Sequence, residues 1–326
     1  MISVHNQGTM KRCLPCVASV IALTTGVGAI AQEYPSKPIR VIVGPGPDIV
    51  ARIMGQKFTE AWGQQVVIDP RPAAGGVVAA DAVAKAPADG YTFLLSSASY
   101  PINAALKVGT TDVIKDFSPV ALAASAPFIL MVHPSLPVKS VQELIALAKA
   151  RPGQINYASS GNGTPPHLAG EMFKSAAAIN IVHVPYKGAG QAMIDLVGGQ
   201  VQMAFAIVSA AMPQVQAGKV RALGVSSPQP SPLAPDLPTL SQSGLPGFDV
   251  KGWNGFVAPA GTPRAVVAKV NAETMRALKQ PEVVQRLKGA GYDAAAENTP
   301  EQFADFIKAE LTKWTKVVRE SGAKVD

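Results

Sequence analysis

The chain has 326 residues, of which 16% are charged and 48% are apolar or aromatic. This composition excludes a disordered or coiled-coil protein, and a length above about 250–300 residues predicts two lobes rather than one core. The net charge of +7 is spread along the chain without an arginine-rich run or interleaved aromatic residues. We therefore expect no nucleic-acid partner.

Residues 1–31 have the pattern of a secretory signal peptide. Lys11 and Arg12 precede an apolar stretch that ends in the small-residue cleavage pattern Ala29-Ile30-Ala31. Export to the periplasm is the predicted outcome, and a retained membrane anchor is the alternative. Both cysteines lie in the removed segment, so we expect no disulfide, cysteine nucleophile or cysteine-bound metal in the mature protein.

Beyond residue 31, short β-branched runs alternate with amphipathic ones. The first kind predicts strands at 39–43, 66–68, 91–95, 128–132, 155–158, 182–184, 201–205 and 220–225. The second kind, with its caps, predicts helices at 49–62, 75–85, 141–148, 193–197 and 262–279, and two more that begin at Pro165 and at the capping box of Thr299. The alternation predicts an α/β fold with parallel strands and helices on both faces.

Motifs of catalysis and cofactor binding are missing from the sequence. It has no G-x-S-x-G, no G-x-x-x-x-G-K-[ST], no H-E-x-x-H and no paired-cysteine zinc site. Two stretches, 44–49 and 188–193, imitate the dinucleotide fingerprint but lack its third glycine, so both are interpreted as turns. His133, His167 and His183 lie far apart in sequence and are expected to be structural. We therefore expect no metal, no cofactor and no enzymatic activity.

Loops between strands and helices offer a different kind of site. The clearest is Ser159–Thr164, where glycines and hydroxyl residues precede a helix with Pro165 at its first position. A helix amino terminus carries roughly +0.5 of a charge and unpaired amides, so it binds anions without a basic side chain. The alternative interpretation is a helix cap on a flexible turn. Residues 96–99 and 75–76 form weaker examples of the same pattern.

Six motifs lie in order along the mature chain between residues 71 and 263. They are RPAAGG at 71–76, AVAKAPADGYT at 82–92, NYASSGNGT with HLAGE at 156–171, HVPYKG at 183–188, GGQVQ at 198–202 and APAGTP at 258–263. In these motifs the chain resembles the receptors of tripartite tricarboxylate transport systems, the Bug family of extracytoplasmic solute-binding proteins.

The resemblance implies a two-lobe fold of the type II periplasmic-binding-protein kind, each lobe a mostly parallel sheet flanked by helices. Lobe 1 is expected at 32–127 plus 256–326 and lobe 2 at 128–255. The lobes are expected to close over a small organic carboxylate, and the loaded monomer to make a transient contact with a membrane permease. The ligand-binding residues that it implies are Gly44, Gly46, Asp48, Ser97, Ala98, Ser99, Ser159, Ser160, Gly161, Asn162, Gly163, Thr164, Phe205 and Ala206.

Two departures from the family pattern bear on the ligand. Relatives usually carry a longer loop between the positions of Val43 and Asp48, so the cleft is more open here or binding is impaired. Many relatives have Phe-Asp-Asn where this chain has Phe205-Ala206-Ile207, which makes that wall apolar. We therefore expect an aromatic or apolar carboxylate, such as benzoate or phthalate, rather than citrate or an amino acid. Candidates for the apolar surface, each more typical of a core, are Phe128, Phe205, Trp253 and Phe256.

Two other functions compete with this one. An exported hydrolase needs a base beside a nucleophile, and His167 follows the hydroxyl-rich loop. A ligand sensor would present the same closed form to a signalling receptor instead of a permease, and the residues alone do not separate sensing from transport.

Overall fold

The computed structural model describes residues 1–5, 34–44, 48–71 and 74–322. Residues from Tyr34 onward belong to one compact unit. Residues 1–5 have no regular structure, and the rest of the expected signal peptide lies outside the described residues. In the described ranges, no helix combines the length and apolar character needed to cross a membrane.

Ten strands form one hydrogen-bonded network in the order β2-β1-β3-β9-β4-β7-β5-β6, with β8 and β10 also paired to β4. The strands are β1 Ile39–Val43, β2 Val66–Pro70, β3 Thr92–Ser97, β4 Phe117–Val132, β5 Asn156–Ser159, β6 Val182–Pro185, β7 Met203–Ile207, β8 Arg221–Val225, β9 Lys251–Pro259 and β10 Asp293–Ala294. The helices are α1 Ile49–Trp62, α2 Val77–Ala84 after a 3-10 turn at Ala74–Gly76, α3 Ser99–Ala105, α4 Val141–Ala150, α5 Pro165–Ala177, α6 Ala189–Val197, α7 Val208–Gln216, α8 Arg264–Leu278, α9 Pro281–Gly289 and α10 Pro300–Ser321.

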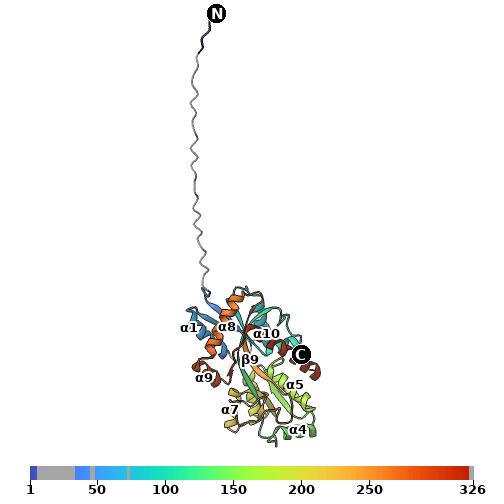
Figure 1. Ribbon diagram of the computed structural model, residues 1–326. Coiled ribbons are helices and arrows are strands. Elements are labelled where there is room, and N and C mark those ends of the chain that lie inside the picture. The colour runs from blue at the N-terminus through green and yellow to red at the C-terminus, as the bar shows by residue number, and fades with distance from the viewer. Residues whose placement is uncertain (6–33, 45–47, 72–73, 323–326) are drawn as a thin grey trace. The chain divides into compact units, whose positions relative to one another are not determined.

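The 16-residue strand β4 divides this network into two half-sheets. From Phe117 to Pro127 it pairs with β9, and from Phe128 to Val132 it pairs with β7 and β8. The first half-sheet therefore contains β2, β1, β3, β9 and β10, and the second contains β7, β5, β6 and β8. Figure 1 shows α1, α8 and α9 around the first and α4, α5 and α7 around the second.

Each half-sheet combines a parallel set with antiparallel strands. The parallel sets are β2-β1-β3 and β6-β5-β7, as the alternation of strands and helices predicted. The antiparallel pairs arise because β4 and β9 run between the sets. Strand β9 pairs with the first part of β4 along its length and with β3 at 254–257, so residues 251–255 belong to the first half-sheet.

The core extends through both half-sheets. One cluster of buried side chains surrounds Trp314 and Phe303 of α10 and continues to Phe173 of α5 and Phe205 of β7. Helix α10 accordingly packs against both α3 and α5. All four aromatic residues considered for the ligand belong to the core: Phe128, Phe205, Trp253 and Phe256 are 4%, 3%, 2% and 1% exposed.

Several elements were missed by the sequence pattern. Strand β9 contains Gly252 and Gly255, which interrupt an apolar alternation. A Cβ at Gly255 would overlap the ring of Phe303 and come within 2.7 Å of the Ala121 carbonyl oxygen, so close packing requires glycine there. Helix α7 has Pro213 in its interior, a residue that is unusual within helices. The interpretation of residues 188–193 as a turn is wrong, because α6 begins at Ala189.

Candidate functional site

The loop Ser159–Thr164 connects β5 to α5 and is held in shape by its own side chains. Thr164 Oγ1 donates to the Gly161 carbonyl (2.6 Å), and the Gly161 amide donates to Ser159 Oγ (3.1 Å). Ser159 Oγ also lies 2.6 Å from Nε2 of His183 on the neighbouring strand β6. The hydroxyls of Ser159 and Thr164 therefore already have partners within the protein.

The start of α5 offers few amides to an anion. The Gly163 amide donates to Nδ1 of His167 at 3.3 Å. The first two residues of the helix are Pro165 and Pro166, which have no N–H group. A helix start with ordinary residues would present more free donors, so this part of the expected anion site is weaker than the loop sequence suggests.

A cavity of about 20 Å³ lies beside this loop in the second half-sheet. It is lined by Ala158, Ser159, Ser160, Pro166, Ala189, Ala192, Met193, Ala204, Phe205 and Ala206. Four residues expected at the ligand therefore meet at one place, although they come from the ends of β5 and β7. Ser160 and Asn162, both half-buried, are the loop residues without a hydrogen-bond partner among the described residues.

Helix α6 begins at the same cavity. Its N-cap is Gly188, which has no side chain to cap the helix, and its first turn contains no acidic residue. Because Ala189, Gly190 and Gln191 are not proline, each keeps an N–H that the helix itself does not use. The positive end of α6 is thus the better anion-binding helix terminus of the two that border the cavity.

The remaining expected ligand residues belong to the first half-sheet. Gly46 lies outside the described residues. Gly44 is buried beside the start of α2, whereas Asp48 is paired with Arg52 at 2.6 Å. Ser97 ends β3, and Ala98 and Ser99 are buried at the start of α3. None of these residues lines the cavity of the second half-sheet.

Asn103 of α3 links the two half-sheets and was not singled out from the sequence. Its Nδ2 donates to the Gly75 carbonyl at 2.8 Å. Its Oδ1 lies so close to Gly163 that a Cβ there would overlap it, and Gly163 has a φ of 71°. Glycine at position 163 therefore allows α3 to approach the loop.

Behind the loop, His183 stacks between two other rings. Its centroid is 4.1 Å from that of His167 and 4.8 Å from that of Tyr157. Burial is the main cause that lowers the pKa of His183 to about 3, and the neighbouring His167 and Lys174 contribute in the same direction. Burial also lowers the pKa of His167, against the opposing effect of Glu171. Both histidines are therefore neutral at ordinary pH.

This group does not form a catalytic dyad despite the contact between Ser159 and His183. Ser159 is 1% exposed, so its oxygen is closed to a substrate, and it already accepts the Gly161 amide. Among the described residues, no group of three or more His, Cys, Asp or Glu side chains is placed to hold a metal ion. The arrangement is that of a binding loop supported by the stacked rings of Tyr157, His183 and His167.

Comparison with known proteins decides the family. The model of the tripartite tricarboxylate transporter family receptor matches residues 50–323. The chain belongs to this family. Its members are solute-binding receptors rather than enzymes, which confirms the resemblance drawn from the six motifs. Protein BugT of Bordetella pertussis is 37% identical over 327 residues, which cover 97% of this chain and 99% of BugT.

Two solved structures share the fold and are more than 30% identical in sequence to this chain. Rpa4515 of R. palustris, solved with adipate, is 32% identical with a TM-score of 0.83, and the match covers 90% of this chain and 100% of that one. MatC (Rpa3494) from Rhodopseudomonas palustris, solved with bound malate, is 31% identical with a TM-score of 0.79 and covers 87% and 100%. The two-lobe α/β expectation is confirmed by these neighbours.

Proposed function

We propose that the protein captures a small organic carboxylate by lobe closure and delivers it to a tripartite tricarboxylate-type permease. The observation that carries the proposal is the cavity where Ser159, Ser160 and Phe205 meet the uncapped start of α6. The N–H groups at the start of α6 and the hydroxyl of Ser160 favour an anion there, and the first turns of α5 and α6 contain no acidic residue to repel it. Adipate and malate, held by the two solved relatives, are carboxylates of this kind.

The lobes of this proposal are the two half-sheets with their helices. The chain crosses between them where β4 changes partner at Pro127 and Phe128, and again before β9 begins at Lys251. These crossings support the expected division into lobe 1 at 32–127 plus 256–326 and lobe 2 at 128–255. Closure brings α3 with Asn103 against the loop at Gly163, which joins the lobes on the ligand side.

The lining favours a ligand with an apolar body. Apart from Ser159 and Ser160, the side chains around the cavity are alanines, Pro166, Met193 and Phe205. A hydroxyl or ammonium group of a ligand placed against this wall would lack a partner, at a cost of about 1–3 kcal/mol. We therefore propose an aromatic or apolar mono- or dicarboxylate in preference to citrate or an amino acid.

The proposal also includes export of the protein to the periplasm, where it acts as a monomer. The pattern at 1–31 supports a cleaved signal peptide. A receptor that collects solute on that side of the membrane meets its permease only transiently, and one lobe pair is sufficient to enclose a small acid. No cofactor takes part in this function.

Titration calorimetry of the mature protein tests the proposal. The panel is benzoate, phthalate, adipate, malate, citrate and glutamate, each at the same ionic strength. The expected result is saturable binding of an acid with an apolar body, and weaker or absent binding of citrate and glutamate. Binding of citrate or glutamate alone would contradict the ligand class, and failure of every acid to bind would contradict the carboxylate-receptor function.

A further inference from the structure

Tyr100 carries a buried polar group that the protein itself leaves without a partner. The side chain is 6% exposed, and its hydroxyl has no hydrogen bond to any described residue. Such a group in a protein interior costs about as much as a lost hydrogen bond unless a water or a ligand completes it. The proposed ligand residues do not include it.

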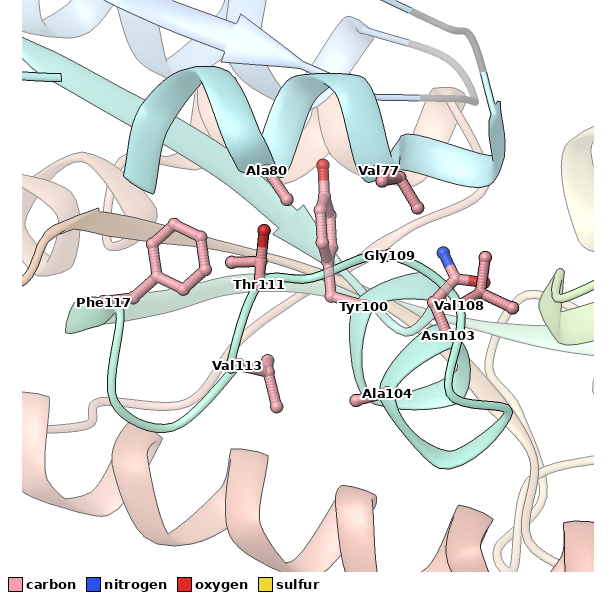
Figure 2. A pocket seen from close by; sticks show the side chains of 10 residues that line it. All are labelled: Val77, Ala80, Tyr100, Asn103, Ala104, Val108, Gly109, Thr111, Val113 and Phe117. Carbon is pink, nitrogen blue, oxygen red and sulfur yellow. The ribbon is translucent and has the colours of Figure 1, made fainter. Parts of the chain in front are cut away.

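The hydroxyl is directed towards the start of α2. Figure 2 shows the ring of Tyr100 rising from α3 so that its oxygen lies against α2 between Val77 and Ala80. A Cβ on Gly44 would come 2.7 Å from this oxygen and 3.4 Å from the Cα of Gly76. The Tyr100 oxygen, the end of β1 and the N-cap of α2 therefore converge on one point.

That point is suited to an acceptor oxygen. Helix α2 has eight residues, has Gly76 as an N-cap without a side chain, and has no acidic residue in its first turn. The Tyr100 O–H can donate a hydrogen bond at this point, and the positive end of α2 favours a negatively charged acceptor there. Gly75 and Gly76, with φ of 62° and 102°, keep the backbone free of side chains at this place.

The point also lies close to the proposed ligand. Tyr100 and Asn103 are three residues apart on α3, so their side chains emerge about one helical turn from each other. Asn103 touches Gly163 of the binding loop, as described above. The Tyr100 oxygen is enclosed in this structure, so a ligand held by that loop would have to extend along one turn of α3 and part the surrounding side chains to contact it.

We propose that Tyr100 is a specificity-determining residue: its hydroxyl donates a hydrogen bond to an oxygen of the second carboxylate of a bound diacid, beside Gly44 and the start of α2. This inference rests on the proposed function and narrows its ligand to diacids. In the free protein the hydroxyl is left without a protein partner, and in the complex the ligand satisfies it.

The test compares Tyr100→Phe with wild type by calorimetry, using adipate and its monoacid counterpart hexanoate, and by thermal unfolding without ligand. Tyr100→Phe is expected to weaken adipate binding about tenfold, to change hexanoate binding less than twofold, and to leave the Tm of the free protein equal or raised. Tyr34→Phe is the matched control, because the Tyr34 hydroxyl donates to the Gly90 carbonyl at 2.6 Å, at the opposite edge of the parallel strands. It is expected to lower Tm without changing either affinity.

Three outcomes would overturn the inference. Equal adipate affinity of wild type and Tyr100→Phe would remove the contact. A lowered Tm with unchanged adipate affinity would assign the hydroxyl to a structural water in the adjacent cavity of about 20 Å³. Wild type that binds hexanoate as tightly as adipate would show that no second carboxylate is recognised. If wild type binds neither acid nor any other carboxylate, the proposed function itself fails and this inference with it.

Discussion

His167 and His183 stack with their ring centroids 4.1 Å apart and their planes inclined by 16°. Each ring supports the binding loop from below, because His183 Nε2 meets Ser159 Oγ and His167 Nδ1 accepts the Gly163 amide. A nitrogen that accepts an N–H carries no proton of its own, so the loop requires neutral His167. Two charged imidazoles at this distance would also repel each other.

Acid is therefore expected to destabilise the protein through this pair. The pKa of His183 is about 3 in the folded state against an ordinary value of 6.5, and that of His167 is also lowered. The unfolded chain binds these protons first as pH falls below 6.5, so stability is full above that value and is lost as pH falls from 6.5 towards 3. The free energy of unfolding measured by urea titration at pH 7.5, 6.0 and 5.0 checks this.

His183→Asn isolates the contribution of the pair. The variant is expected to be less stable than wild type at pH 7.5 and to lose less stability between pH 7.5 and 5.0. His133→Asn is the matched control, since it removes a histidine that contacts Ser135 away from the loop. An identical pH dependence in wild type and His183→Asn would contradict the role of the stacked pair.

Gly163→Ala is expected to impair both stability and ligand binding. The backbone at Gly163 has a φ of 71°, which costs an alanine roughly 1–2 kcal/mol, and the new Cβ would overlap Asn103 Oδ1. Gly218→Ala provides the matched control, since Gly218 has a φ of 67° but nothing within 4 Å of a Cβ. It should show the backbone cost without a loss of affinity.

A second substitution separates the clash from the backbone strain. Adding Asn103→Ala to Gly163→Ala removes the overlapping oxygen and should recover part of the lost stability relative to the sum of the single changes. Strict additivity of the two, measured by urea unfolding, would show that the contact between α3 and the loop has no energetic consequence.

Much of the fold follows from local pattern. Strands such as 39–43 and helices such as 49–62 were predicted because the period of their apolar residues is clear and caps mark their ends. Strand β9 was not, because Gly252 and Gly255 serve long-range packing against α10 and β4 that no local window contains. The change of partners within β4 likewise depends on tertiary pairing.

The candidate site was likewise predictable only where it depends on local sequence pattern. The loop Ser159–Thr164 has a recognisable mixture of glycine and hydroxyl residues. The stacking of Tyr157 on His183 arises only once β5 pairs with β6 in the register that aligns these two residues, so spacing along the chain gave no signal. The missing amides of Pro165 and Pro166, by contrast, were present in the sequence and limit the anion site at α5.

Glu310→Gln is expected to destabilise the protein by about 1–3 kcal/mol. The buried carboxylate accepts from Trp253 Nε1 at 3.0 Å and Trp314 Nε1 at 3.1 Å and pairs with Lys313, so it fixes β9 to α10. Asp305→Asn breaks the exposed pair with Lys308 on the same helix and should change stability by less than about 0.5 kcal/mol. Equal urea-unfolding energies for the two variants would contradict a structural role for Glu310.

Ala206→Asp is expected to weaken binding of acids with an apolar body, such as adipate and phthalate, at least about tenfold. It restores the Asp that many relatives carry at this position and so places a charge against the apolar wall of the proposed ligand cavity. Ala206→Asn, which has the same shape without the charge, is the control and should lose less. Calorimetry with adipate and phthalate at low and high salt checks the electrostatic origin. An aspartate variant that binds these acids like wild type would place the ligand elsewhere.

The central claim is that a carboxylate binds where the Ser159–Thr164 loop meets the start of α6. Proton–nitrogen correlation spectra of the isotope-labelled protein, recorded during an adipate titration, test it most directly. The account predicts that the amides of Ser160, Asn162 and Ala189–Gln191 shift together and saturate at one dissociation constant. Shifts that leave these five amides in place while another region responds would contradict it.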